Sequence, residues 1–127
     1  MTSPARPLEG IKVVELSHMV LGPSCGLILA DLGADVVKVE PAPEGDKTRQ
    51  LPGSGSGYFG AFNRNKRSVS VDLKSAEGHK FALKLVNESD VLIENFGAGV
   101  LDRLGLGYDA IQKINPRLVY CALKGFL

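Results

Sequence analysis

Short runs rich in valine and isoleucine alternate along the chain with segments of helical periodicity. The runs occupy residues 11–16, 36–39, 69–73, 91–93 and 118–123. Four of them have the composition of strands that are covered on both faces of a parallel sheet. Strands that alternate with helices indicate βαβ crossovers. The 127 residues suffice for one such domain or for part of a larger one. We therefore predict an α/β fold with a doubly wound parallel sheet and flanking helices.

Four segments between these runs are expected to be helices. Residues 22–35, GPSCGLILADLGAD, carry almost no charge and predict a buried helix that starts near Pro23 and stops before Gly33. Ser75 is placed to cap a helix over residues 76–89. Two shorter helices are expected within residues 99–105 and 108–116. Residues 41–58 are rich in Pro, Gly and Ser, so we interpret them as a flexible surface loop, with a lid as the alternative.

Charge, cysteine content and hydropathy exclude several classes of protein. The 15 basic and 14 acidic side chains give a formal charge of +1, so no nucleic-acid partner is expected. Cys25 and Cys121 form no ligand-spaced cluster, which predicts neither a disulfide framework nor a metal site. No run reaches the roughly 18 apolar residues of a membrane span, and the N-terminus lacks the apolar core of a signal peptide. We expect a soluble, cytoplasmic protein without a membrane partner.

The residues that follow each predicted strand are the candidate site residues, because ligands of open α/β sheets bind beyond the carboxyl ends of the strands. Glu40 stands where a dinucleotide-binding fold keeps its ribose-binding acid. However, GPSCG is not a G-x-G-x-x-G turn and Pro23 lacks an amide N–H, so NAD binding is disfavoured. His18 is an acid–base candidate, although its sequence neighbours favour a structural role. The basic turn NRNKRS, residues 63–68, fits phosphate contacts or a solvated strand entry.

The fourth run ends in an Asn-Phe-Gly sequence, residues 95–97, with a short helix beyond it. A small amide, an aromatic ring and a glycine permit hydrogen bonding, stacking and close backbone approach. The cations available for phosphate groups are Lys74, Arg103 and Lys124. Coenzyme A has an apolar arm, amide groups and phosphates, and it would use all of these features. Polar strand ends also occur in many unrelated α/β domains.

Five segments resemble the N-terminal portion of the class III CoA-transferases, the family of formyl-CoA transferase and carnitine CoA-transferase. They are LEGIKVVELSH, GPSCGLILADLGADVVKVE, FNRNKRSVSVDLK, DVLIENFGAGVLDRLGLGYDAI and NPRLVYCALKGF. The resemblance runs from about Pro7 to the last residue. It implies a Rossmann-like large domain, of which residues 1–127 are the N-terminal, CoA-binding part. It also implies a homodimer of two interlinked chains for the complete protein.

The resemblance further implies a set of coenzyme A contacts. They are Val20, Leu21, Val71, Asp72, Leu73, Lys74, Asn95, Phe96, Gly97, Arg103 and Lys124, with His18 near the bound substrate. Three positions depart from formyl-CoA transferase. Val20 and Leu21 replace a glutamine and an alanine, and Pro41 replaces an arginine near the adenine. Specificity for oxalate and formate is therefore not implied.

The catalytic residue implied by the resemblance is not in this chain. In the family, an aspartate beyond the position of Lys124 attacks the acyl-CoA thioester, forms a mixed anhydride and then becomes an aspartyl-CoA thioester. We therefore expect no catalytic residue here, a chain that is inactive alone, and a remainder that is missing or is a separate chain. The expected substrates are an acyl-CoA and a carboxylic acid acceptor, with no metal. Two alternatives stay open: an α-methylacyl-CoA racemase, and a non-catalytic CoA-binding or partner chain.

Overall fold

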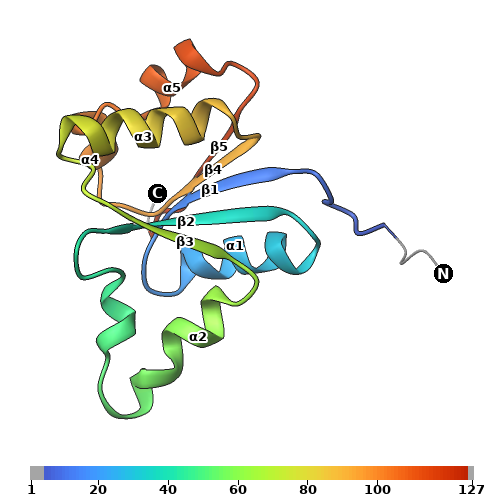
Figure 1. Cartoon of the computed structure of the whole chain (residues 1–127), viewed down its shortest axis with the longest axis vertical. Coiled ribbons are helices and arrows are strands. Elements are labelled where there is room, and N and C mark those ends of the chain that lie inside the picture. The colour runs from blue at the N-terminus through green and yellow to red at the C-terminus, as the bar shows by residue number, and fades with distance from the viewer. Residues whose placement is uncertain (1–4, 126–127) are drawn as a thin grey trace.

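The computed structural model describes residues 5–125, and five strands in this part of the chain form one parallel sheet (Figure 1). The strands are β1 (Lys12–Leu16), β2 (Asp35–Pro41), β3 (Arg67–Val71), β4 (Val91–Glu94) and β5 (Val119–Ala122). Their order is β3-β2-β1-β4-β5. This confirms the predicted α/β class with a parallel sheet. The order reverses between β1 and β4, and doubly wound folds bind ligands at such a switch point.

Helices cover both faces of the sheet (Figure 1). Helices α3 (Ala76–Asn87), α4 (Val100–Arg103) and α5 (Tyr108–Ile114) lie on one face, and α1 (Leu21–Asp31) and α2 (Tyr58–Asn63) on the other. The four predicted helices are present, and the Ser75 hydroxyl accepts a hydrogen bond from the Gly78 amide, as the predicted cap requires. No helix within residues 5–125 is long and apolar enough to cross a membrane.

Two apolar clusters hold the helices to the sheet, one on each face. Val14 and Leu16 of β1 belong to the cluster under α3, together with Ala82 and Val86 of that helix. Val13 belongs to the other cluster, under α1. Successive side chains of a strand point to opposite faces, so neighbouring valines serve different layers. Burying each apolar side chain of this size contributes roughly 1.5–3 kcal/mol to the free energy of folding. Because the strands supply such side chains to both clusters, the sheet holds both helical layers in place.

The expectation that the α1 segment is buried is wrong for one face of the helix. Gly22 and Gly26 are buried against the sheet. By contrast, Leu21, Ile28 and Leu32 are 52%, 60% and 40% exposed. The absence of charge in this segment indicated that the helix is apolar, but it gave no information on what each face contacts.

Residues 42–57 contain more structure than the predicted flexible loop. They include two 3-10 helices, η1 (Lys47–Gln50) and η2 (Gly53–Gly57). The Asp46 carboxylate caps η1 by accepting hydrogen bonds from the amide of Thr48 at 2.8 Å and from its hydroxyl at 2.7 Å. Asp46 and Thr48 are both buried. The segment therefore lies at the surface, as predicted, but it contains short 3-10 helices and is anchored by the two buried side chains.

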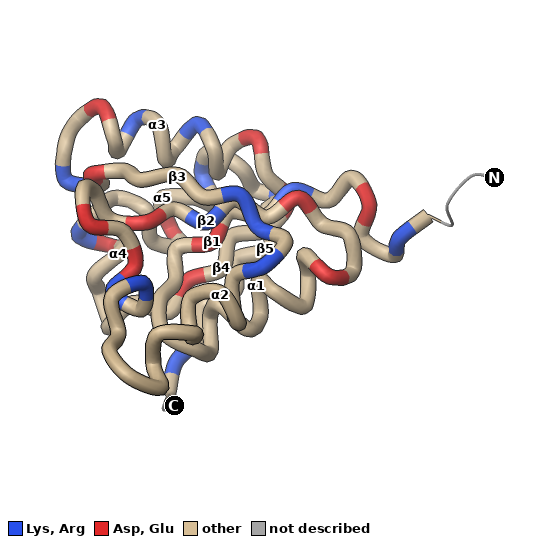
Figure 2. The backbone as a smooth tube through the Cα atoms, turned by 60° about the horizontal axis from the view of Figure 1, so that its bottom comes forward, with Lys and Arg blue, Asp and Glu red and all other residues tan. Residues whose placement is uncertain are grey.

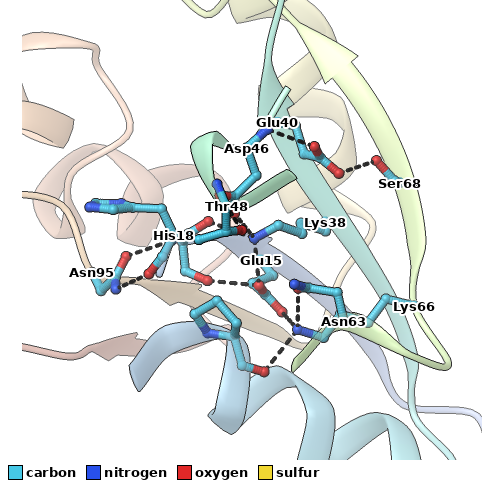
Figure 3. A network of polar contacts seen from close by, with 12 residues as sticks. Glu15, His18, Lys38, Glu40, Asp46, Thr48, Asn63, Lys66, Ser68 and Asn95 are labelled. Carbon is cyan, nitrogen blue, oxygen red and sulfur yellow. Dashed lines mark hydrogen bonds and ion pairs between the residues drawn. The ribbon is translucent and has the colours of Figure 1, made fainter. Parts of the chain in front are cut away.

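A buried charge network lies between the sheet and the α1–α2 layer (Figure 3). Lys38 Nζ lies 3.1 Å from Glu15 Oε1 and 3.0 Å from Asp46 Oδ2. Lys66 Nζ lies 2.7 Å from Glu15 Oε2. All four side chains are at most 1% exposed. Two ammonium groups thus compensate two carboxylates, which matters because an unpaired buried charge costs several kcal/mol.

The Lys66 side chain extends the charge network to the helical layer. Its ammonium donates to the Pro23 carbonyl at 2.8 Å and to Asn63 Oδ1 at 2.9 Å. Burial lowers the pKa of Lys66, and the Glu15 carboxylate opposes this effect. The prediction of a solvated strand entry is therefore wrong for Lys66. It holds for its exposed neighbours Arg64 and Arg67, which form ion pairs with Asp31 and Asp35.

We expect Gly26→Ala to destabilise the protein, because the added Cβ would overlap Glu15 Oε2 and lie 3.2 Å from Lys66 Nζ. Overpacking of this kind costs about 1–3 kcal/mol. Urea unfolding followed by circular dichroism measures the loss. Gly60→Ala is the matched control, since a Cβ there meets open space in α2 and should stabilise by up to about 1 kcal/mol. A Gly26→Ala protein as stable as wild type would contradict the close approach of α1 to the charge network.

Candidate functional site

An apolar cavity of about 330 Å³ opens at the carboxyl ends of β2 and β3. Five of the predicted coenzyme A contacts line this apolar cavity, namely Val71, Asp72, Leu73, Lys74 and Phe96. The rest of its apolar wall is formed by Val39, Pro41, Ala42, Val100 and Leu104. Pockets that bind small molecules are lined mainly by apolar and aromatic side chains with a few polar groups, and this cavity has that composition.

The turn after β3 shapes one wall of the apolar cavity. Asp72 Oδ1 accepts a hydrogen bond from the Lys74 amide at 2.9 Å, and the Asp72 carbonyl accepts one from the Ser75 amide at 3.1 Å. These bonds end the strand at Val71, two residues before the predicted end at Leu73. They leave Leu73 half-buried and Lys74 exposed.

A basic cavity of about 470 Å³ adjoins the apolar one and shares Leu73, Lys74 and Leu104 with it. Arg103 and His79 also line the basic cavity. Lys74 and Arg103 are exposed, and neither forms an ion pair with any residue in the range 5–125. Cations in this state are available for charge-assisted hydrogen bonds to phosphate oxygens. The two cavities together offer an apolar slot followed by a cationic rim.

The Glu40 carboxylate closes the back of the apolar cavity and is fully engaged. Arg49 binds it through two nitrogens at 2.7 Å each, the Ser68 hydroxyl donates at 2.6 Å, and the Asp46 amide donates at 2.8 Å. The Arg49 guanidinium also lies 3.6 Å from the centre of the Phe59 ring. Burial would raise the pKa of Glu40, but hydrogen bonds from Arg49, Ser68 and Asp46 lower it to about 2. A carboxylate with these partners is not free to bind a ribose.

His18 and Asn95 meet at the switch point between β1 and β4 (Figure 3). Asn95 Oδ1 accepts a hydrogen bond from the His18 amide at 2.9 Å, and Asn95 Nδ2 donates to the His18 carbonyl at 2.8 Å. The imidazole ring of His18 lies 5.6 Å from the ring of Phe96, which lines the apolar cavity. Val20 and Leu21 follow at the start of α1 and are 38% and 52% exposed.

The two remaining predicted contacts, Gly97 and Lys124, line a separate cavity of about 190 Å³. The Lys124 ammonium lies 2.6 and 2.9 Å from the two oxygens of Glu94 and donates to the Phe96 carbonyl at 2.8 Å. Its charge is therefore largely compensated. Gly97 has no positive φ, and a Cβ there would only touch Val100 at 3.8 Å. Burial, with the carboxylates of Glu94 and Asp102, raises the pKa of nearby Tyr120 to about 12.

Sequence reasoning missed residues of both the apolar cavity and the charge network. Val100 and Leu104 stand four positions apart around α4, a spacing that places both on one helix face. Glu15 and Lys38 interrupt valine-rich strands and are register partners across β1 and β2. A charge in each of two neighbouring apolar strands is the signal that could have revealed the buried pair. Within residues 5–125, no group of three or more His, Cys, Asp or Glu side chains is arranged to hold a metal ion.

The fold defines a doubly wound α/β protein, and its two adjoining cavities lie at the carboxyl edge of the sheet, where proteins of this class bind ligands. Residues 8–127 match the family model described as CoA-transferase family III. The chain therefore belongs to that family, and the resemblance seen in the sequence is confirmed.

Named relatives and solved structures agree with this assignment. The chain is 48% identical over 126 residues to a formyl-CoA:oxalate CoA-transferase of Streptomyces coelicolor, covering 96% of this chain and 30% of the relative. It is 46% identical over 131 residues to an acyl-CoA transferase of Fusarium pseudograminearum, covering 94% and 29%. A CAIB/BAIF family protein from Brucella suis superposes with a TM-score of 0.89 at 47% identity, covering 97% of this chain and 34% of that one. Rv3272 from Mycobacterium tuberculosis gives a TM-score of 0.92 at 40% identity, covering 98% and 35%. The chain thus spans about a third of the length of the proteins it matches.

We expect Glu40→Gln to lower stability at neutral pH by about 2 kcal/mol, after allowing for solvent around the half-exposed Arg49. The folded-state pKa of Glu40 is lowered from 4.5 to about 2, so its contribution is complete above pH 4.5 and is lost as the pH falls towards 2. Unfolding by urea at several pH values measures the difference between variant and wild type. The difference should shrink in this window. Glu44→Gln, at an exposed position of the same segment, is the control, and a pH-independent difference for Glu40→Gln would contradict the prediction.

Proposed function

We propose that this chain is the coenzyme A-binding part of a CoA-transferase, which moves CoA from an acyl-CoA to a carboxylic acid. The observation that carries the proposal is the apolar cavity joined to the basic cavity. Five predicted contacts line the first, and Lys74 and Arg103 line the second. The named relatives are CoA-transferases, which supports the reaction class.

The two cavities suit different parts of coenzyme A. Phe96 offers an aromatic surface, and Leu73 and Leu104 an aliphatic one, for the adenine or the pantetheine arm. Lys74 and Arg103 stand at the adjoining rim, where phosphate groups would lie. His18, Val20 and Leu21 follow along the carboxyl edge towards the switch point, and we assign them to the thioester end of the ligand. Lys124 would join this site only by exchanging its ion pair with Glu94 for a contact with coenzyme A.

The chemical step in this proposal belongs to the rest of the protein. An aspartate outside these 127 residues attacks the thioester carbonyl, and the CoA thiolate leaves as the mixed anhydride forms. The thiolate then attacks the aspartyl carbonyl, which gives an aspartyl-CoA thioester and releases the donor acid. The acceptor carboxylate attacks this thioester and forms a second anhydride as the thiolate leaves. The thiolate attacks the acceptor carbonyl of that anhydride, which gives the new acyl-CoA and frees the aspartate. The residues described here bind and orient the thioester, which is required for the attack but does not perform it.

We expect Arg103→Ala to weaken binding of coenzyme A about tenfold or more, because one charge-assisted hydrogen bond to phosphate is lost. Binding of dephospho-CoA should fall less if Arg103 contacts the 3′-phosphate. Isothermal titration calorimetry measures both affinities. Arg117→Ala is the matched control, since Arg117 is exposed beside the opposite, amino end of β5. Equal effects of the two substitutions would remove Arg103 from the site.

We expect the 127-residue chain to bind coenzyme A without catalysing transfer, and we expect transfer when the remaining polypeptide of a full-length protein is supplied. The assay follows exchange of an acyl group between acyl-CoA and a labelled carboxylate. Exchange by the chain alone, in proportion to its concentration, would overturn this part of the proposal. Loss of an α-deuteron from the acyl-CoA without exchange in the full-length protein would instead favour the racemase reaction.

A further inference from the structure

One asparagine side chain holds the backbone of the turn that follows β1. Strands β1 and β4 are neighbours, and the last pair of their register is Leu16 with Glu94. Beyond this pair the backbone hydrogen bonds between the two strands stop. There the Asn95 side chain accepts a hydrogen bond from the His18 N–H at 2.9 Å and donates one to the His18 carbonyl at 2.8 Å (Figure 3). Both backbone hydrogen-bonding groups of His18 are thus engaged by a single side chain, and we call this pair of hydrogen bonds the Asn95 clamp.

The residue that follows this clamp has an unfavourable backbone conformation. Met19 has a φ of 63°, in the left-handed region that residues with a Cβ rarely adopt. The first turn of α1 packs on the same place, because a Cβ at Gly22 would lie 3.1 Å from Asn95 Cγ and would overlap the Ser17 side chain. The turn over residues 17–20 is therefore held by Asn95 on one side and by α1 on the other.

The conformation of this turn decides where His18, Val20 and Leu21 lie at the carboxyl edge of the sheet. The His18 ring reaches Phe96, which lines the cavity. Val20 and Leu21 follow Met19 directly and are exposed at the same edge. A change of φ at Met19 would redirect the chain on both sides of it and move all three groups.

We infer that Asn95 is a positioning residue. It assists ligand binding through the backbone of His18, by keeping residues 17–20 in the left-handed turn, and not through a contact of its own side chain with the ligand. A short side chain with one acceptor and one donor is needed to engage both backbone groups, and asparagine has it. This inference rests on the proposed function, because the ligand concerned is coenzyme A.

Asn95→Leu tests the clamp in the 127-residue chain. Amide hydrogen exchange, followed residue by residue with NMR, should become about tenfold faster at His18, since its N–H loses its acceptor. The Val14 amide, within β1, should keep its exchange rate and so report that the sheet is intact. Asn95→Asp retains the acceptor and removes the donor, and it should give an intermediate rate at His18. Unchanged exchange at His18 in Asn95→Leu, with Val14 also unchanged, would overturn the inference.

Met19→Gly separates positioning from direct ligand contact. Glycine adopts the left-handed conformation without steric cost, so the turn should need the clamp less in this background. We expect Asn95→Leu to weaken coenzyme A binding about tenfold in the parent chain and by roughly threefold or less in the Met19→Gly chain. Equal losses in both backgrounds would show that Asn95 contacts the ligand itself, and would overturn the inference alone. A parent chain that binds no coenzyme A would overturn the proposed function and the assigned role together.

Discussion

The carboxylate of Glu15, buried between the ammonium groups of Lys38 and Lys66, is the interaction on which the rest of the structure depends. It joins β1 to β2 and to the residue that precedes β3, while Lys38 extends the contact to Asp46. Removing one partner of such a group leaves an uncompensated charge in the interior, which costs about 3–5 kcal/mol. The order of the segment after β2 therefore depends on charges within the sheet. Figure 2 shows acidic and basic positions interspersed along the backbone, including positions on the central strands.

The candidate ligand site, in contrast to the charge network, is lined mainly by apolar side chains. Its walls are apolar side chains from the ends of β2, β3 and α4, and its cations stand at an exposed rim. At the strand ends the ladder hydrogen bonds stop, so side chains complete the bonding, as Asn95 does for His18. Asp72 does the same for the turn after β3. These turns at the carboxyl edge are thus held by local side chain to backbone bonds rather than by secondary structure.

Much of the fold followed from patterns within short windows of sequence. Alternating strand and helix segments predicted the parallel sheet, and Ser75 predicted the start of α3. The misjudged features depend on residues far away in the chain. For Lys66 the sequence suggested either phosphate contacts or a solvated strand entry, and its burial was missed because its partner Glu15 lies on another strand. The Pro, Gly and Ser content of residues 41–58 concealed the buried Asp46, and the pairing of Lys124 with Glu94 exists only because β4 and β5 are adjacent.

The side of the sheet on which the charge network lies has a consequence for how such a protein changes in evolution. Glu15 and Lys38 stand two residues from Val13 and Val36, so they share the α1 face. Val39, Val71 and Leu104 belong to the cluster on the α3 face. The ion pairs of Glu15 and these three apolar side chains of the cavity wall therefore lie on opposite faces of the sheet, and Glu40, which lines the cavity and accepts from the Asp46 amide, connects the two regions. Substitutions at Val71 or Leu104 can therefore reshape the cavity without touching the ion pairs of Glu15, so its shape can change on an unchanged framework.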